Sequence, residues 1–369
     1  MPPSPGWAGD RPLFAAILAG GVGTRLWPRS RRRCPKQLLD IVNRRTMLQD
    51  TVERVQPLIP VQRIFVVTGS EYAEQVRTQL PELPPGNVLV EPSGRGTAPC
   101  IGLAAVALSH IAPQAIMFSL HADHVIVDAA RFRQLLLVAA ETAASGRLVT
   151  LGIQPTYPET GYGYIERGPL VRRIQGVSVF SVKRFIEKPP LEQACEYVRD
   201  GHHYWNSGLF AWRIDTILQA MQRYLPELHA QLSTIAQAWS TPRQEEILSQ
   251  VWGGIRSVSI DVGIMEKAED VAVVPADMGW SDIGSWASLA DIMAANAEGN
   301  VILGESEHLS LDTRDSLVYA PGRVVATIGL RDLIVVDTGD VLLICPKSRA
   351  QDVKQIVEQL RTSGRHDLL

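Results

Sequence analysis

The sequence predicts an α/β fold with a mixed, mostly parallel sheet flanked by helices, followed by a small C-terminal β-rich appendage. Short apolar runs typical of strands buried on both faces alternate with helical periodicities through residue 153. After Asn300 the pattern changes to short Val, Ile and Leu runs separated by Gly, Asp and Pro. We therefore expect a lead-in without structure over residues 1–11, a main domain over 12–297 and a small β-rich domain with a final helix over 298–369.

The individual elements follow from local patterns. Leu13 to Ala19 is a continuous apolar run that ends in glycines, as a buried strand of a parallel sheet does. Thr97 is expected to cap a helix over 97–111, with Pro99 in its first turn. Further strands are predicted at 64–68, 87–90, 115–120, 148–153, 177–186, 207–212 and 271–275. Further helices are predicted at 129–145, 191–199 and 351–360.

Charge and hydropathy limit the classes of partner. The 369 residues hold 36 Lys and Arg against 39 Asp and Glu, a net charge of -3. This balance lacks the basic excess of a nucleic-acid binder or of a polybasic membrane anchor. No apolar stretch reaches the roughly 18 residues of a membrane helix, and the N-terminal segment lacks the basic start and apolar core of a signal peptide. We expect a cytoplasmic protein with neither nucleic-acid nor membrane partners.

The loop after the first strand, Gly20 to Arg25, is rich in glycine. Such a turn can cradle phosphate, because backbone N–H groups point inward and glycine allows close approach. It is neither a P-loop, which ends in Gly-Lys-Ser/Thr, nor the dinucleotide fingerprint, which needs glycine where Leu26 stands. Arg25 can donate two hydrogen bonds to a phosphate, and Lys36 adds a point charge. The alternative is a tight turn with solvated basic residues, the interpretation we give to Arg29, Arg31, Arg32 and Arg33.

The segment Leu18 to Pro28, followed by Pro35-Lys36-Gln37, resembles the signature of sugar-nucleotide pyrophosphorylases. It is most similar to the mannose-1-phosphate guanylyltransferase branch, in its short form without an isomerase domain. The resemblance covers about residues 13–290 and implies a Rossmann-like fold of the nucleotide-diphospho-sugar transferase type. It also implies that Arg25 binds the leaving pyrophosphate and Lys36 the reacting phosphates. The loop residues implied to wrap the nucleotide are Leu18, Ala19, Gly20, Gly21, Gly23, Thr24 and Arg25. The segment Glu91 to Pro99 resembles the part that holds base and ribose, which implicates Glu91, Arg95 and Thr97.

Two carboxylates are candidate metal ligands. Asp123 follows directly after a buried strand, at the edge of an open α/β sheet where ligands bind. One or two carboxylates with phosphate oxygens suit Mg²⁺. The Asp123-His124 pair and Asp282, within Gly279 to Trp286, resemble the family's metal segments, so we hypothesise that Asp123 and Asp282 share one Mg²⁺. Taken alone, Asp282 is more typical of a helix cap, and His121 and His124 of hydrogen-bonded side chains than of a metal pair.

The resemblance also implies a sugar-phosphate site. Its five residues are Gly163, Glu187, Lys188, Asn206 and Asp261. Glu187 is implied to accept from sugar hydroxyls and Lys188 to contact the sugar phosphate. Without the resemblance, Glu187 and Lys188 indicate a solvated pair, Asn206 a turn residue, and Asp261 either a site residue or a helix cap.

Together these segments imply a nucleotidyltransferase that uses Mg²⁺ to transfer GMP from GTP to mannose 1-phosphate, giving GDP-mannose and pyrophosphate. One alternative keeps the chemistry but uses another hexose or heptose 1-phosphate or another NTP. An alternative of a different class is a catalytically silent paralogue that binds sugar nucleotides and regulates a partner. Too few residues follow Asn300 for a cupin-type isomerase domain, so we expect no isomerase activity. The resemblance also implies a homodimer formed through the C-terminal appendage.

Overall fold

The computed structural model describes residues 9–21 and 23–369, so most of the expected lead-in, residues 1–8, lies outside the described residues. The chain divides into two compact units. The first unit comprises the chain through Gly20 together with Thr51–Ala122 and Ile126–Trp280, and the second comprises Gly21–Asp50, Asp123–Val125 and Ser281–Leu369. The glycine-rich loop and the C-terminal strands therefore belong to one unit.

The first unit is built on one large sheet. Its order in the described residues is β3-β2-β1-β4-β9-β6-β10-β8-β7. The pairings of β1 with β2 and β4, of β2 with β3, and of β6 with β10 are parallel, whereas β9 is antiparallel to both β4 and β6. The strands are β1 (Leu13–Ala19), β2 (Ile64–Gly69), β3 (Val88–Glu91), β4 (Ile116–His121), β6 (Leu148–Ile153), β7 (Gly163–Ile174), β8 (Val177–Glu187), β9 (His203–Arg213) and β10 (Val271–Ala276). The mostly parallel mixed sheet confirms the predicted fold class.

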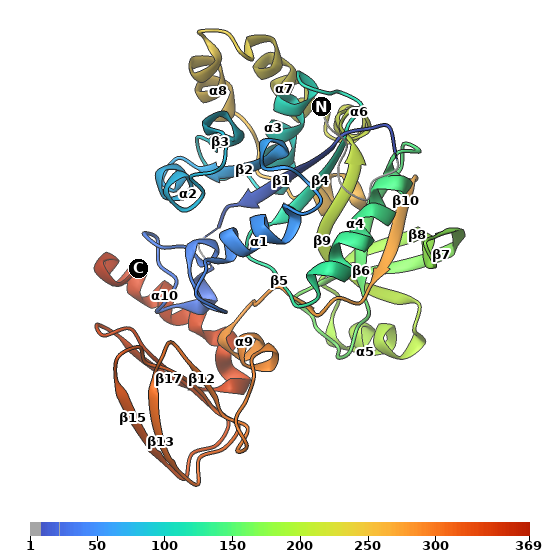
Figure 1. Ribbon diagram of the computed structural model, residues 1–369. Coiled ribbons are helices and arrows are strands. Elements are labelled where there is room, and N and C mark those ends of the chain that lie inside the picture. The colour runs from blue at the N-terminus through green and yellow to red at the C-terminus, as the bar shows by residue number, and fades with distance from the viewer. Residues whose placement is uncertain (1–8, 22) are drawn as a thin grey trace. The chain divides into compact units, whose positions relative to one another are not determined.

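Helices cover the sheet, as Figure 1 shows. β1 is buried along its whole length, and Phe14, Ala16 and Leu18 share a core with the apolar helix α3. Since alternate residues of a strand face opposite sides, a strand buried at every position must be covered on both faces. The helices of this unit are α2 (Ala73–Gln79), α3 (Thr97–Ser109), α4 (Ala129–Ala143), α5 (Leu191–Asp200), α6 (Ile214–Tyr224), α7 (Pro226–Ala238) and α8 (Gln244–Trp252). α1 (Met47–Val55) spans the boundary between the units.

The hairpin of β7 and β8 was only half anticipated. Strand β8 matches the predicted strand, but the sequence pattern indicated no strand for most of β7. The β7–β8 register shifts between Glu166 and Arg167, between Arg167 and Leu170, and between Leu170 and Arg172. Each irregularity interrupts the alternation of apolar and polar residues that identifies a strand, so β7 has no regular signature.

The second unit contains the predicted β-rich appendage. Strands β12 (Val301–Leu303), β14 (Leu317–Tyr319) and β16 (Leu333–Asp337) stack in parallel, and β17 (Leu342–Pro346) adds an antiparallel edge. A second parallel pair is β13 (Glu307–Leu311) with β15 (Val324–Ile328). The remaining elements are α9 (Trp286–Ile292), α10 (Val353–Thr362), the short strands β5 (Val125–Ile126) and β11 (Trp280–Ser281), and 3₁₀ turns that include Thr24–Leu26 and Lys36–Leu38. Among all described helices, none combines the length and apolarity needed to cross a bilayer.

Candidate active site

Lys36 lies at the centre of a polar cluster in the second unit. Its side chain is 6% exposed, and Nζ donates to Asp123 Oδ2 at 2.9 Å and to the backbone carbonyl of Asp282. A buried ammonium is stable only where such acceptors surround it. Gly23 makes room for this lysine, since its φ is +70° and a Cβ there would lie 2.5 Å from Lys36 Cβ. The cluster therefore depends on the glycine loop as well as on the lysine.

Asp282 is held in a tight local turn. The backbone N–H of Gly284 donates to Asp282 Oδ1 at 3.0 Å, and that of Ile283 donates to Ser281 Oγ at 3.1 Å. The helix that follows is capped by Ser285, which forms a reciprocal capping box with Ser288. Asp282 is therefore not the cap of α9, and the helix-cap interpretation of this residue is wrong.

The oxygen atoms around Lys36 are the kind that a hard divalent cation takes. Asp123 stands two residues beyond the end of β4, and its carboxylate meets the same ammonium as the main chain of Asp282. Two segments far apart in sequence thus present oxygen ligands to one positive charge. Mg²⁺ prefers one or two carboxylates together with phosphate oxygens. The Asp123 carboxylate and the Asp282 carbonyl oxygen are of the kind that fits this ion, and the assignment of Asp123 and Asp282 as the residues that would hold it stays a prediction.

Arg25 belongs to the 3₁₀ turn Thr24–Leu26, which the left-handed Gly23 initiates. Its side chain is exposed, and among the described residues its guanidinium has no hydrogen-bond or ion-pair partner. An unpaired guanidinium on a glycine-rich turn is suited to donate hydrogen bonds to phosphate oxygens. Gly21 and Thr24 belong to the same loop, and their assignment to nucleotide binding stays a prediction.

The basic run after this turn is not uniformly solvated. Arg29 pairs with Asp40, and Arg31 forms a two-point ion pair with Asp340 at 2.6 and 2.8 Å. Only Arg32 and Arg33 are exposed in the way the sequence suggested. The interpretation of this run as a solvated surface is therefore wrong for Arg29 and Arg31, and the partner of Arg31 lies in the turn between β16 and β17.

In the first unit, β1 ends with Leu18 and Ala19, and Gly20 follows it directly. Strand β3 ends with Glu91. Glu91 is only 5% exposed and lies near Gly20, where a Cβ would approach its Oε1 to 3.7 Å. Its other oxygen, Oε2, is buried without a hydrogen-bond partner among the described residues. Burial, reinforced by the neighbouring Glu71 charge, raises the pKa of Glu91 to about 7. Such a carboxyl can accept hydrogen bonds from a ligand that brings its own donors.

Arg95 and Thr97 both contact the segment 253–260. Arg95 donates to the Gly253 carbonyl at 3.1 Å, and Thr97 Oγ1 accepts from the Ile260 N–H at 2.8 Å. Gly96 between them has φ +83°, and a Cβ there would lie 2.5 Å from the Val258 carbonyl oxygen. The segment is therefore fixed by its backbone as well as by these side chains. A direct role of Arg95 and Thr97 toward a nucleotide stays a prediction.

The five residues of the predicted sugar-phosphate site are brought together by β7, β8, β9 and the turn Asp261–Met265. Gly163 pairs with Glu187 across β7 and β8, and a Cβ on Gly163 would lie 2.8 Å from Glu187 Oε2. Asn206 Nδ2 donates to Asp261 Oδ1 at 2.7 Å. Asn206 therefore contacts another predicted site residue, and Asp261 opens its turn without capping it.

The residues of this site and their neighbour Glu266 include more acidic than basic side chains. Burial raises the pKa of Asp261, an effect that the Asn206 hydrogen bond opposes and the Glu187 charge reinforces. Burial and the Glu187 charge also raise the pKa of Glu266, a neighbour that the sequence analysis did not single out. Lys188 is the nearby cation, with its Nζ on Glu187 Oε1 and its backbone at φ +48°. The set offers several acceptors and one exposed ammonium.

Comparisons with known proteins agree with this geometry. The nucleotidyl transferase family matches residues 14–299, and the MannoseP isomerase/GMP-like beta-helix domain matches residues 306–360. The first match covers most of the chain, so the class of protein is a nucleotidyltransferase enzyme.

Individual relatives narrow this class. The chain is 41% identical to the mannose-1-phosphate guanylyltransferase of Escherichia coli, and the alignment covers 96% of this chain and 75% of that protein. It is 40% identical to the mannose-1-phosphate guanylyltransferase ManC of Salmonella typhimurium, and that alignment covers 96% of this chain and 74% of that protein. A solved structure from Thermus thermophilus, described as a mannose-1-phosphate geranyltransferase, is 37% identical with a TM-score of 0.84, and the likeness covers 95% of this chain and 99% of that one. The chain belongs to the mannose-1-phosphate guanylyltransferase family.

Proposed function

We propose that this enzyme transfers GMP from GTP to mannose 1-phosphate, with Mg²⁺, and produces GDP-mannose and pyrophosphate. The observation that carries the proposal is the buried Lys36 ammonium, which meets Asp123 and the main chain of Asp282 beside a glycine-rich loop. This arrangement combines a fixed cation with a carboxylate and a carbonyl oxygen suited to a divalent ion, as phosphoryl chemistry requires. The names of the relatives support the sugar phosphate as acceptor.

In this reaction an oxygen of the sugar phosphate attacks the α-phosphorus of GTP, and the bond from that phosphorus to the bridging oxygen of pyrophosphate breaks. The attacking oxygen is already anionic, so no side chain has to act as a strong base. The difficulty is to bring two polyanions together and to stabilise the crowded transition state. Bound Mg²⁺ would neutralise phosphate oxygens and polarise the phosphorus. Lys36 would hold the reacting phosphates, and Arg25 the pyrophosphate as it leaves.

The choice of GTP is supported by Glu91. Guanine presents N1–H and the 2-amino group side by side, and a carboxylate can accept from both donors. Adenine offers an acceptor at N1 beside a single donor group, so it would leave one of the two carboxylate oxygens unpaired, at a cost of roughly 1–3 kcal/mol. Because Oε2 has no partner among the described residues, a guanine base would satisfy it. We therefore assign Glu91 as the reader of the base.

The sugar is supported by the acceptors around Asn206. Glu187, Asn206 and Asp261 offer oxygen atoms within one network, and sugar hydroxyls are the donors that would satisfy them. Lys188 supplies the exposed ammonium for the sugar phosphate. The same set could serve another hexose or a heptose 1-phosphate, which is the nearest alternative substrate.

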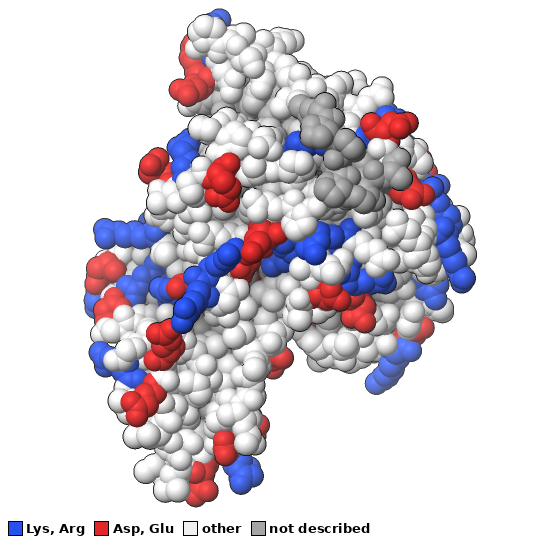
Figure 2. All heavy atoms as spheres, viewed as in Figure 1, with Lys and Arg blue, Asp and Glu red and all other residues white. Residues whose placement is uncertain are grey.

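We further propose that the protein works as a cytoplasmic homodimer. Several large apolar side chains of the C-terminal strands are exposed, namely Leu309, Leu311, Val324, Ile328, Leu342 and Ile344. On the face shown in Figure 2 the C-terminal strands carry few charged side chains. Covering such side chains with a second copy would remove apolar surface from water. Sedimentation of the purified chain tests this, and a monomer at micromolar concentration would contradict it.

The function is tested by mixing the purified protein with Mg²⁺ and mannose 1-phosphate, adding GTP, ATP, UTP or dTTP separately, and measuring pyrophosphate release. Release with GTP above all other nucleotides is the expected result. Release only after another sugar 1-phosphate replaces mannose 1-phosphate would move the assignment to the alternative substrate. Nucleotide binding by calorimetry without release from any pair would instead identify a silent sugar-nucleotide-binding protein.

A further inference from the structure

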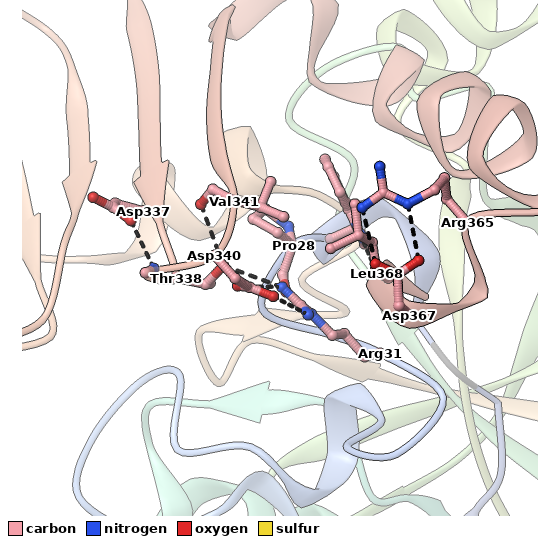
Figure 3. Close-up of polar contacts among 11 residues, drawn as sticks. Pro28, Arg31, Asp337, Thr338, Asp340, Val341, Arg365, Asp367 and Leu368 are labelled. Atoms are coloured by element: carbon pink, nitrogen blue, oxygen red, sulfur yellow. Dashed lines mark hydrogen bonds and ion pairs between the residues drawn. The ribbon is translucent and has the colours of Figure 1, made fainter.

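The loop that carries Arg25 and Lys36 is tied at its midpoint to the C-terminal strands of the same unit. The tie is Arg31, six residues after Arg25 and five before Lys36. Its two terminal nitrogens donate to the two carboxylate oxygens of Asp340, at 2.6 and 2.8 Å, as Figure 3 shows. A third bond runs from Nη2 to Thr338 Oγ1 at 3.2 Å. Arg31 and Asp340 are 309 residues apart in the sequence.

The turn that presents Asp340 is itself held in one shape. It connects β16 to β17, and its ends are joined by a hydrogen bond from the Thr338 N–H to the Val341 carbonyl at 3.0 Å. Thr338 Oγ1 donates to Asp340 Oδ1 at 3.0 Å, and Asp337 Oδ1 accepts from the Gly339 N–H at 2.7 Å. The Arg31 guanidinium holds the pKa of Asp340 down at about 2, so the carboxylate stays charged through the working range of pH. The partner of Arg31 is thus a fixed anion on a short hairpin.

From Arg31 the hydrogen bonds continue toward Arg25. Arg31 Nε donates to the Pro28 carbonyl at 2.9 Å, and the adjacent Ser30 donates through Oγ to the Gly23 carbonyl at 2.6 Å. The Leu26 N–H also donates to the Gly23 carbonyl, at 3.0 Å. These bonds close the turn on which Arg25 stands. Its position is therefore fixed relative to Arg31.

Hydrogen bonds also continue from Arg31 toward Lys36. Arg31 and Cys34 exchange both backbone hydrogen bonds at 3.0 Å, which directs the chain back toward Pro35 and Lys36. The indole of Trp27 donates to the Leu368 carbonyl at 2.8 Å, and that of Trp286 to the Trp27 carbonyl at 3.0 Å, so the start of the loop has a second attachment. Both predicted catalytic cations lie on one hydrogen-bonded loop whose midpoint is Arg31.

We propose that Arg31 and Asp340 are positioning residues for nucleotidyl transfer, through which the C-terminal β unit sets the placement of Arg25 and Lys36. This role rests on the proposed function. The C-terminal strands then contribute to the rate of the reaction and not only to assembly. The bidentate geometry matters, because two parallel bonds fix the orientation of a planar guanidinium where one bond would leave it free to rotate.

Three variants of the full chain test the proposal. Asp340→Asn removes the charge and one acceptor at nearly constant size. Arg31→Lys keeps the charge but loses the two-point grip. Asp352→Asn is the matched control, because Asp352 lies on the same unit and its ion-pair partner is Arg349, at 2.8 Å, and not a residue of the loop. Each is assayed for kcat and KM with GTP, for the KM of pyrophosphate in the reverse reaction, for Tm, and for amide hydrogen exchange over residues 23–36.

Asp340→Asn and Arg31→Lys should each lower kcat by about 10- to 100-fold, because misplacement of a catalytic group by about 1 Å can cost that much. Both should raise the KM of pyrophosphate and speed hydrogen exchange over residues 23–36. Tm should stay close to that of the control, since the pair is 20% and 49% exposed and such pairs add little to stability.

Unchanged hydrogen exchange and kcat in Asp340→Asn would overturn the proposal, as would a loss of kcat equal to that of Asp352→Asn. A wild-type protein without pyrophosphate release would refute the proposed function instead, while hydrogen exchange would still report whether Asp340 holds the loop.

Discussion

The two units treat buried charge in opposite ways. In the second unit the buried Lys36 ammonium is matched by Asp123 and by the Asp282 carbonyl. In the first unit the buried carboxyls of Glu91 and Asp261 have no lysine or arginine ion-pair partner among the described residues, and burial raises the pKa of both. A buried ammonium that has acceptors within the protein stays charged, so it can interact with a charged group of a ligand. Glu91 Oε2 lacks a hydrogen-bond donor among the described residues, and Asp261 accepts from the neutral Asn206 amide, so both carboxyls suit neutral ligand groups that donate hydrogen bonds.

This difference corresponds to the two parts of the proposed substrates. Phosphates carry the charge of the reaction, and the Lys36 cluster with Arg25 would act on them. The guanine base and the sugar hydroxyls are neutral donors, and Glu91 and the Asn206 network would recognise them. The comparison therefore predicts that variants in the second unit change the rate, whereas variants in the first unit change substrate preference or affinity.

The largest effect is expected from Asp123 and Asp282, the two residues whose oxygen atoms accept from Lys36. Asp123→Asn and Asp282→Asn should each lower kcat by about 10²–10³-fold, because they remove the negative charge that would hold Mg²⁺, the cation that balances the phosphate charge. Circular dichroism and Tm should change little, since asparagine keeps the size and one acceptor. Asp277→Asn, at an exposed position, is the control. Wild-type kcat in both variants would remove the metal assignment.

A smaller effect is expected from Lys188. Lys188→Ala should raise the KM for mannose 1-phosphate by about 10- to 100-fold with a smaller change in kcat, as expected for the loss of one charged hydrogen bond. Lys183→Ala is the matched control on β8, the strand that Lys188 directly follows, since Lys183 pairs with Glu166 at 3.2 Å. Initial rates over a range of sugar phosphate concentrations measure the effect. Equal KM values in the two variants would contradict the role of Lys188.

The pKa of Glu91 predicts a pH dependence for GTP. Only the ionised carboxylate accepts from both guanine donors, so with a pKa of about 7 the KM for GTP should fall about tenfold between pH 6 and pH 8. Glu91→Gln should remove most of this dependence. The measurement is KM for GTP at several pH values at saturating Mg²⁺. A wild-type slope that persists in Glu91→Gln would assign the titration to another group.

The smallest effect concerns stability. Because the folded-state pKa of Glu91 is raised, the folded protein holds this proton over a range of pH in which the unfolded chain has lost it. The contribution of Glu91 to stability is therefore full below about pH 4.5 and is lost as pH rises through about 7. Between pH 5 and pH 8 the Tm of the wild type should fall a few degrees further than that of Glu91→Gln. Parallel Tm curves would contradict the pKa shift.

Much of the fold was predictable because its signals are local. The apolar run of β1 lies within a few residues, and both β1 and α3 appear where expected. The prediction that Thr97 caps α3 is wrong, because Gly96 is the N-cap and Thr97 Oγ1 accepts from the Ile260 N–H instead. Strand β7 was not predicted, because its bulges break the alternation. The grouping of Asn206 with Asp261 agrees with the family resemblance, and periodicity alone would not have shown it.

The ion pair of Arg31 could not be predicted. Its partner Asp340 lies 309 residues away in a turn with no distinctive pattern, and Arg31 itself stands in a run of arginines that looks solvated. Only the three-dimensional structure pairs them. The raised pKa of Glu91 was equally hidden, since it depends on burial and on Glu71.

The difference between the two units is tested most directly with ITP, which lacks the 2-amino group of GTP. The measurement is the ratio of kcat/KM for GTP to kcat/KM for ITP in the wild type, in Glu91→Gln and in Asp123→Asn. The account predicts that Glu91→Gln lowers this ratio by about tenfold or more, whereas Asp123→Asn lowers both values and leaves the ratio unchanged. An unchanged ratio in Glu91→Gln, or a changed ratio in Asp123→Asn, would contradict the division of base recognition and phosphate chemistry between the two units.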